Sequence, residues 1–220
     1  FANGGLDWSR GRTRPGAGEV ALVGPNAASG WVAMEGVRLY IYLECTLGGG
    51  TLWYDRRRQE DLARLSLERG DLHDRRSFGV VFGGAAATAE LRLGLSLHSV
   101  EQARRFVLET RDRSFDQVVH DTRAQWNEYA NHIQVEGGTE EQKQILYSSL
   151  YHSLVKPARW PEGPWWWASC RRGEAPPFYV DFATMWDQYK TQLPLLLSLY
   201  PERGAEIVKG LLALAEHMGH

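Results

Sequence analysis

One change of pattern constrains the fold more than any other feature, since strand-like sequence gives way to helix-like sequence near residue 110. Before that point, short alternating runs are separated by Gly and Pro turns. Residues 37–43 alternate aliphatic side chains with Arg38, Tyr40 and Tyr42, as a half-buried strand does. Further strands are expected at 52–54, 77–82 and 88–97. Strands followed by helices predict an α+β multidomain chain whose first part, residues 1–110, belongs to an antiparallel β-sandwich.

The expected strand at 88–97 gathers its apolar residues on one face. These side chains alternate with polar or small residues, as a strand with one covered face requires. The apolar positions are Ala89, Leu91, Leu93, Leu95 and Leu97.

The second half carries helix start signals. Ser99 is placed to cap a short helix, and Ser114 with Gln117 and Thr139 with Gln142 have the spacing of a capping box. The helix after Thr139 is expected to stop at Pro157.

Two more helices are expected toward the C-terminus. One covers 183–200 with a kink at Pro194, and the other covers 202–218 after Pro201 in a first-turn position. On the last helix, helical spacing predicts one buried apolar face. Its members are Ala205, Val208, Leu211, Leu212 and Ala215.

Charge and hydropathy exclude several classes of partner. The 25 basic and 27 acidic side chains give a net charge of −2, without the basic excess of a nucleic-acid-binding protein. No apolar run has the length of a membrane span. The two cysteines, Cys45 and Cys170, leave one disulfide or two free thiols open, so they fix no compartment. The chain opens on Phe1, so no signal is visible, and a secreted or periplasmic location stays open.

Tryptophan is the unusual residue here. Nine are present, and Trp165, Trp166 and Trp167 are consecutive within a long irregular segment at 157–178. Trp186 and Asp187 are adjacent at the start of the next expected helix. An indole face with a carboxylate beside it suits sugar recognition, because the ring packs on the sugar and the carboxylate accepts from two hydroxyls. The alternative is core packing by Trp186, with Asp187 near the helix N-terminus or paired with Lys190.

Other polar groups give no site from sequence. His217 and His220 have metal-ligand spacing but lack a third ligand, and Glu140 with Glu141 suits the first turn of a helix. No metal ligands are therefore assigned in this chain.

Three segments resemble glycoside hydrolase family 92, in the right order. The run 144–152 with Pro157 is similar to the family's FYTALYH segment, and 179–196, around Trp186 and Asp187, is similar to its Y…S.WDT.RT..PL segment. Residues 96–109 resemble its S..S.EQA…E segment. Together they cover about residues 90–200.

The resemblance implies an exo-acting, inverting, calcium-dependent α-mannosidase that joins a β-sandwich to an (α/α)6 barrel. Residues 111–138 would be a helical linker and 139–220 the start of the barrel. Trp186, Asp187 and Lys190 would contact carbohydrate, and Trp165, Trp166, Trp167 and Tyr179 are further candidates. Lys190 replaces the family's Arg, so a two-pronged contact would be lost. The general acid, the base and most calcium ligands are expected beyond His220, so this chain alone is expected to be inactive.

Two other readings stay open. Another (α/α)6-barrel sugar enzyme, of the glucoamylase or trehalase type, has the same architecture. A non-catalytic carbohydrate-binding protein would use the same aromatic residues without the acid and base. The oligomeric state is not predicted.

Overall fold

The computed structural model describes residues 6–7, 12–13, 17–34, 37–54, 56–67, 78–84, 88–167, 173–182 and 185–219. The chain divides into two compact units, Phe1–Phe115 and Asp116–His220. The boundary lies close to the place where the sequence pattern changes. Cys170 and His220 lie outside the described residues.

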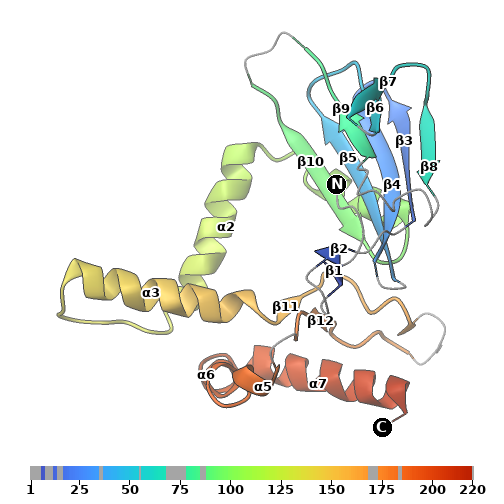
Figure 1. The fold of residues 1–220 in the computed structure, drawn as a ribbon. Coiled ribbons are helices and arrows are strands. Elements are labelled where there is room, and N and C mark those ends of the chain that lie inside the picture. The colour runs from blue at the N-terminus through green and yellow to red at the C-terminus, as the bar shows by residue number, and fades with distance from the viewer. Residues whose placement is uncertain are drawn as a thin grey trace. The chain divides into compact units, whose positions relative to one another are not determined.

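The first unit is built on two antiparallel sheets (Figure 1). The larger sheet has the strand order β10-β5-β4-β3-β8 and the smaller one β7-β6-β9. The larger sheet contains β3 (Gly18–Gly24), β4 (Ala27–Met34), β5 (Val37–Cys45), β8 (Arg64–Leu67) and β10 (Leu91–Ser96). The smaller sheet contains β6 (Thr51–Tyr54), β7 (Arg57–Gln59) and β9 (Phe78–Val81), and a separate pair is formed by β1 (Leu6–Asp7) and β2 (Arg12–Thr13). The predicted strands at 37–43, 52–54, 77–82 and 88–97 are confirmed with small shifts at their ends.

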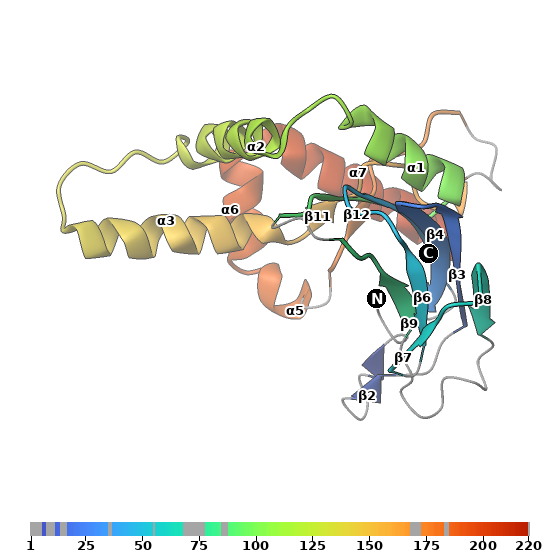
Figure 2. The same ribbon diagram turned by 90° about the horizontal axis from the view of Figure 1, so that it is seen from above.

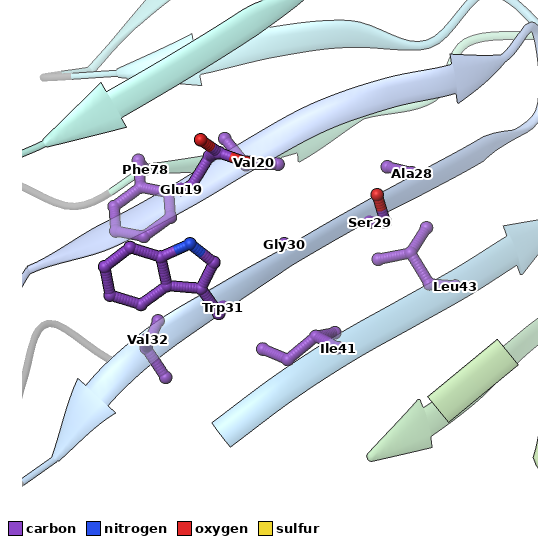
Figure 3. A pocket seen from close by; sticks show the side chains of 10 residues that line it. All are labelled: Glu19, Val20, Ala28, Ser29, Gly30, Trp31, Val32, Ile41, Leu43 and Phe78. Carbon is purple, nitrogen blue, oxygen red and sulfur yellow. The ribbon is translucent and has the colours of Figure 1, made fainter. Parts of the chain in front are cut away.

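Side chains from both sheets form the core of this unit. The buried cluster joins Val20, Val32 and Ile41 of the larger sheet to Leu52 and Phe78 of the smaller one. Figure 3 shows the side chains around a small cavity in this region. The cavity has a volume of about 10 Å³, close to the space of one water molecule. The sandwich interior is therefore packed and holds no ligand-sized pocket here.

The opposite face of the larger sheet is covered by helix α1 (Val100–Glu109), which is labelled in Figure 2. Ser99 caps this helix by accepting from the Gln102 N–H at 3.1 Å, as predicted. Ala103 and Val107 pack on Tyr42, which is buried. The expectation of a half-buried strand is therefore wrong for Tyr42, because a helix covers the second face of β5.

The expected pattern of burial fails at Leu91 and Leu93 of strand β10, whereas Leu95 packs against the sandwich core as expected. Leu91 and Leu93 are 60% and 52% exposed, whereas Gly94 and Ser96 are buried. The strand lies at the edge of its sheet, and α1 packs on the face that carries the small residues. A Cβ at Gly94 would come within 1.9 Å of the Ala103 carbonyl oxygen. Close approach of the helix therefore decides which face of β10 is covered.

The second unit contains α2 (Phe115–Ala130), α3 (Glu140–Val155), α5 (Met185–Gln188), α6 (Gln192–Leu199) and α7 (Pro201–Met218). Helix α2 starts directly after Ser114. The capping box of Thr139 and Gln142 is present at the start of α3, and α3 ends before Pro157, both as predicted. A core of Leu150, Leu154, Leu196 and Tyr200 ties α3 to α6 and to the junction with α7.

The predicted helix at 183–200 is instead two helices. The break lies at 189–191, and Pro194 sits in the first turn of α6. A first-turn Pro causes no kink, because its missing N–H would have no partner inside the helix.

Helix α7 covers a different face from the predicted one. Its buried residues are Gly204 and Ile207, whereas Ala205 is exposed and Val208 and Leu212 are 46% and 61% exposed. Leu211 and Ala215 are half-buried. Apolar side chains cover a wide stripe of this helix, and packing against α6 buries only one edge of that stripe.

A two-stranded ladder closes the base of the irregular segment. Strands β11 (Ala158–Arg159) and β12 (Tyr179–Val180) pair antiparallel, so the residues between them form a long hairpin. None of the helices in the described part of the chain combines the length and apolar character of a membrane span.

Candidate functional site

The Trp–Asp segment lies on the short helix α5. Trp186 is 70% exposed, which is unusual because Trp side chains are on average largely buried. Asp187 belongs to the same helix, but its side chain lies outside the described part of the structure. Lys190 follows the helix and is exposed, with its ammonium 5.6 Å from the centre of the Tyr189 ring. The segment thus presents an open indole at Trp186 and an exposed cation at Lys190.

The three consecutive tryptophans have different environments. Trp166 is 8% exposed and stacks on His217 of α7, with ring centres 4.3 Å apart and planes 5° apart. Trp167 packs edge-on against Trp166 and donates its indole N–H to the Gly173 carbonyl at 3.4 Å. Trp165 is 42% exposed and packs edge-on against Phe178. Of the three, Trp165 has the most accessible ring. Trp166 packs the hairpin against α7 through its stack on His217.

Tyr179 is buried and bonded inside the protein. Its hydroxyl donates to the Glu206 carboxylate at 2.8 Å, and the same carboxylate lies 3.4 Å from Arg159. Burial, followed by the bond to Glu206, raises the pKa of Tyr179 well above its ordinary value. Tyr179 therefore stays neutral and anchors β12 to α7.

The predicted residues fall into two groups in the described structure. Trp166 and Tyr179 meet α7, whereas Trp186 and Asp187 lie on α5. No ring contact within the described residues joins Trp186 to the Trp165–Trp167 group. His217, considered above as a metal ligand, stacks on Trp166 instead.

Sequence reasoning missed Arg159, Glu206 and Arg203 as organising residues. Arg203 donates to the carbonyls of Leu154 and Pro157, at 3.0 and 2.9 Å. The partners of these three side chains lie far away in sequence, so no local spacing could have pointed to them.

A bound cation needs several ligand side chains gathered in one place. No three His, Cys, Asp or Glu side chains gather within this part of the chain in a way that could hold a metal ion. Calcium needs six to eight oxygen ligands, so the described residues do not fit a calcium site. Cys45 is buried with a free thiol.

Solved structures similar to this chain are mannosidases. The family GH92 alpha-mannosidase BT3965 from Bacteroides thetaiotaomicron aligns with a TM-score of 0.70 and 16% identity, covering 90% of this chain and 28% of that chain. Its complex with Mannoimidazole gives 0.69 and 16%, with coverages of 90% and 27%. The Family GH92 Inverting Mannosidase BT2199 from Bacteroides thetaiotaomicron VPI-5482 gives 0.73 and 19%, with coverages of 92% and 29%. No curated protein sequence matches this chain.

At these identities the likeness shows the fold, which is a β-sandwich portion followed by the first helices of a helical barrel. The chain spans 28% of the length of the first of these structures. The sequence itself matches the model of the Glycosyl hydrolase family 92 catalytic domain over residues 102–220, which is more than half of the chain. The chain therefore belongs to glycosyl hydrolase family 92.

Proposed function

We propose that the full-length protein is an exo-acting glycoside hydrolase that removes terminal sugars, foremost α-mannose, with inversion. Family membership supports the reaction class. The names of the solved relatives support the sugar, because they are mannosidases, one is named as inverting, and one was solved with Mannoimidazole. The domain boundaries are part of the proposal. Residues 1–110 are the C-terminal part of a β-sandwich domain, residues 111–138 are a helical linker, and residues 139–220 are the start of the catalytic barrel.

The exposed indole of Trp186 is the observation that carries the proposal for this chain. An exposed Trp keeps a large apolar area in water, which is costly unless a ligand covers it. A pyranose has an apolar C–H face that can cover such a ring. Asp187, next in sequence, would accept hydrogen bonds from two hydroxyls of the same sugar. We assign Trp186 and Asp187 to binding of the terminal sugar.

Lys190 gives the subsite a different cation from the family's usual Arg. An ammonium is a compact charge with three donors, whereas a guanidinium is a planar fork. Lys190 would therefore offer single hydrogen bonds to a sugar oxygen. This difference is compatible with a change of linkage preference within the family.

Inversion needs two further carboxyl groups. One protonates the leaving oxygen, and the other activates water on the opposite face of the ring, at a separation of ~6.5–9.5 Å. We assign neither role to this chain, and its own residues contribute binding and orientation. Calcium dependence is part of the proposal for the full-length protein, and no step is assigned to the metal here.

The test is hydrolysis of an aryl α-mannoside by the full-length protein and its Asp187→Ala variant. Loss of two hydrogen bonds to a carboxylate, at about 1.5–3 kcal/mol each, should lower kcat/KM by ~100-fold or more. Asp112→Ala, in an exposed turn after α1, is the matched control and should retain full activity. Trp186→Phe should retain more activity than Trp186→Ala.

Three results would contradict parts of the proposal. If the wild-type protein releases no aryl group from α-mannosides, the sugar or the reaction is wrong. If Asp187→Ala matches Asp112→Ala, the sugar-binding role of Asp187 is wrong. A chelator should abolish activity and added calcium should restore it, and activity indifferent to both would remove calcium from the proposal.

A further inference from the structure

A polar cleft of about 490 Å³ lies between the 158–180 hairpin and helix α7. None of its lining residues belongs to α5, so it is separate from the Trp186 and Asp187 segment. The hairpin strands β11 and β12 and helix α7 are labelled in Figure 1. Seven charged or aromatic side chains line it, and they are Arg159, Trp160, Glu162, Glu174, Phe178, Glu206 and Lys209.

Backbone packing fixes the walls of this cleft. The two arms of the hairpin are joined by the Trp160 N–H, which donates to the Phe178 carbonyl at 2.8 Å. They also lie close together at Gly163, where a Cβ would lie 2.5 Å from the Cβ of Ala175. Helix α7 touches the second arm at Gly210, where a Cβ would lie 2.7 Å from the Pro177 carbonyl oxygen. A cleft held by such contacts is formed before a ligand arrives, which lowers the entropic cost of binding.

Two carboxylates in the cleft are oriented by their own hydrogen bonds. Glu206 accepts from Tyr179 through one oxygen and faces Arg159 with the other. Glu162 accepts the Trp160 indole N–H at 3.1 Å through one oxygen. A carboxylate has about four acceptor positions, so one that already has one or two partners still accepts further hydrogen bonds from a ligand. The bond to Glu162 also holds the Trp160 ring in place, half-buried at the cleft wall.

The charges select the class of ligand. Among the described lining residues, the three carboxylates of Glu162, Glu174 and Glu206 outnumber the two cations of Arg159 and Lys209. A phosphate, sulfate or carboxylate ligand would meet net repulsion at short range. A neutral polyol offers hydroxyl donors to oriented carboxylates and an apolar face to an aromatic ring, so it fits both features.

We propose that this cleft is a second carbohydrate-binding site, which takes a neutral saccharide on Trp160 with Glu162 and Glu206 as hydroxyl acceptors. The proposal goes beyond the hydrolase function, because this site would hold the glycan without acting on the scissile bond. Lys209 supplies a donor at the α7 side of the cleft. The function of such a site is to keep the protein on a multivalent glycan between cleavage events.

The test is retardation of the full-length protein in native gels that contain a soluble polysaccharide. The Asp187→Ala background weakens the proposed terminal-sugar subsite, so retardation there reports the cleft. Neutral α-mannan and dextran are the probes, and polygalacturonate is the anionic comparison. We expect retardation by a neutral polymer, its loss in Trp160→Ala, and its retention in Trp160→Phe.

Glu162→Gln provides a second variant of nearly unchanged shape. Replacing a charged acceptor by a neutral one should weaken binding about fivefold to tenfold. Glu202→Gln, on the exposed first turn of α7, is the matched control and should leave retardation unchanged. Thermal melts check whether each variant folds. If Trp160→Ala does not fold, the test of the cleft is the difference in retardation between Glu162→Gln and Glu202→Gln.

Three outcomes would overturn the inference. They are equal retardation of the Glu162→Gln and Glu202→Gln proteins, retardation by the anionic polymer alone, and no retardation by either neutral polymer. The result is separable from the proposed function, because aryl α-mannoside hydrolysis tests only the latter. A protein that fails to cleave mannosides but loses dextran retardation on Trp160→Ala would keep the cleft and lose the mannosidase proposal.

Discussion

Two of the tryptophans that the sequence singles out, Trp166 and Trp186, have opposite environments. Trp166 is 8% exposed and stacked on His217, whereas Trp186 is 70% exposed. Both belong to segments that suggested sugar contact, yet a buried and stacked ring has no free face for a pyranose. At the residue scale the structure therefore points to Trp186 as the open aromatic surface, and it gives Trp166 and Tyr179 roles in holding the hairpin on α7.

Tyr179→Phe should destabilise the protein by about 1.5–3 kcal/mol. The change removes a hydrogen bond to a charged carboxylate and leaves Glu206 with Arg159 as its described partner. Urea unfolding at pH 7 measures the difference. Tyr151→Phe is a suitable control, since Tyr151 is 48% exposed. Equal stability of the two variants would show that the Glu206 bond adds nothing.

The same tyrosine predicts a loss of stability at alkaline pH. The pKa of Tyr179 is raised in the folded protein, while the unfolded chain ionises at the ordinary value of 10.0. The folded state therefore binds the Tyr179 proton more tightly than the unfolded chain does. The contribution of Tyr179 to the free energy of unfolding is complete below pH 10 and falls as the pH rises above 10. The free energy of unfolding should decline less steeply above pH 10 in Tyr179→Phe than in the wild type.

At the scale of elements, the C-terminal end of α3 is held by side chains from the helices that follow it. The side-chain amide of Gln192 donates to the Ser153 carbonyl at 2.6 Å and also to that of Lys156. Arg203 donates to the carbonyls of Leu154 and Pro157. These carbonyls would otherwise lack partners, as the last carbonyls of a helix do. Capping of α3 thus depends on tertiary contacts with α6 and α7.

Arg203→Met should cost about 1–3 kcal/mol of stability. Methionine keeps much of the side-chain bulk but cannot donate, so two carbonyls lose their partner. Chemical denaturation is the measurement, with Arg123→Met on the exposed face of α2 as control, expected within ±0.5 kcal/mol of wild type. A change no larger than that of the control would contradict the capping role.

Gly94→Ala tests the packing of α1 on the large sheet. A Cβ at this position would meet the Ala103 carbonyl oxygen at 1.9 Å, so the helix must shift away from β10. Overpacking of this kind costs about 1–3 kcal/mol or more. Gly48→Ala is the matched control, because nothing lies within 4 Å of its added Cβ. Thermal melting should show a lower Tm for Gly94→Ala alone.

At the scale of the whole molecule, each unit exposes large apolar side chains. In the second unit Ile145, Val208 and Leu212 are 61%, 46% and 61% exposed, and in the first unit Leu91 and Leu93 are more than half exposed. Apolar surface of this extent on single elements marks places where other protein surface packs. In the proposed full-length protein, we expect the rest of the helical barrel to cover α3 and α7.

The 220-residue chain produced alone should therefore bind a hydrophobic dye and self-associate. Val208→Lys with Leu212→Glu should reduce both effects, because they place charges on the exposed stripe of α7. Dye fluorescence and light scattering measure the change. A monodisperse wild-type chain with no dye binding would show that these side chains are covered in solution.

Features that depend on neighbouring residues could be predicted from the sequence. The strand-rich and helical halves, the caps at Ser99 and Thr139 and the end of α3 before Pro157 all follow from hydrogen bonds and backbone angles within a few residues. The Trp186–Asp187 segment was also visible, because the resemblance to family 92 rests on contiguous motifs.

Which faces are covered depends on long-range packing, and it could not be predicted from the sequence. Tyr42 is buried because α1 lies over β5, and α7 buries Gly204 and Ile207 because these residues, not Val208 or Leu212, meet its neighbours. The stack of Trp166 on His217 and the bond of Tyr179 to Glu206 join residues distant in sequence. Local patterns specify which elements form, but burial is a property of the surfaces that long-range packing brings together, and no local spacing encodes that choice.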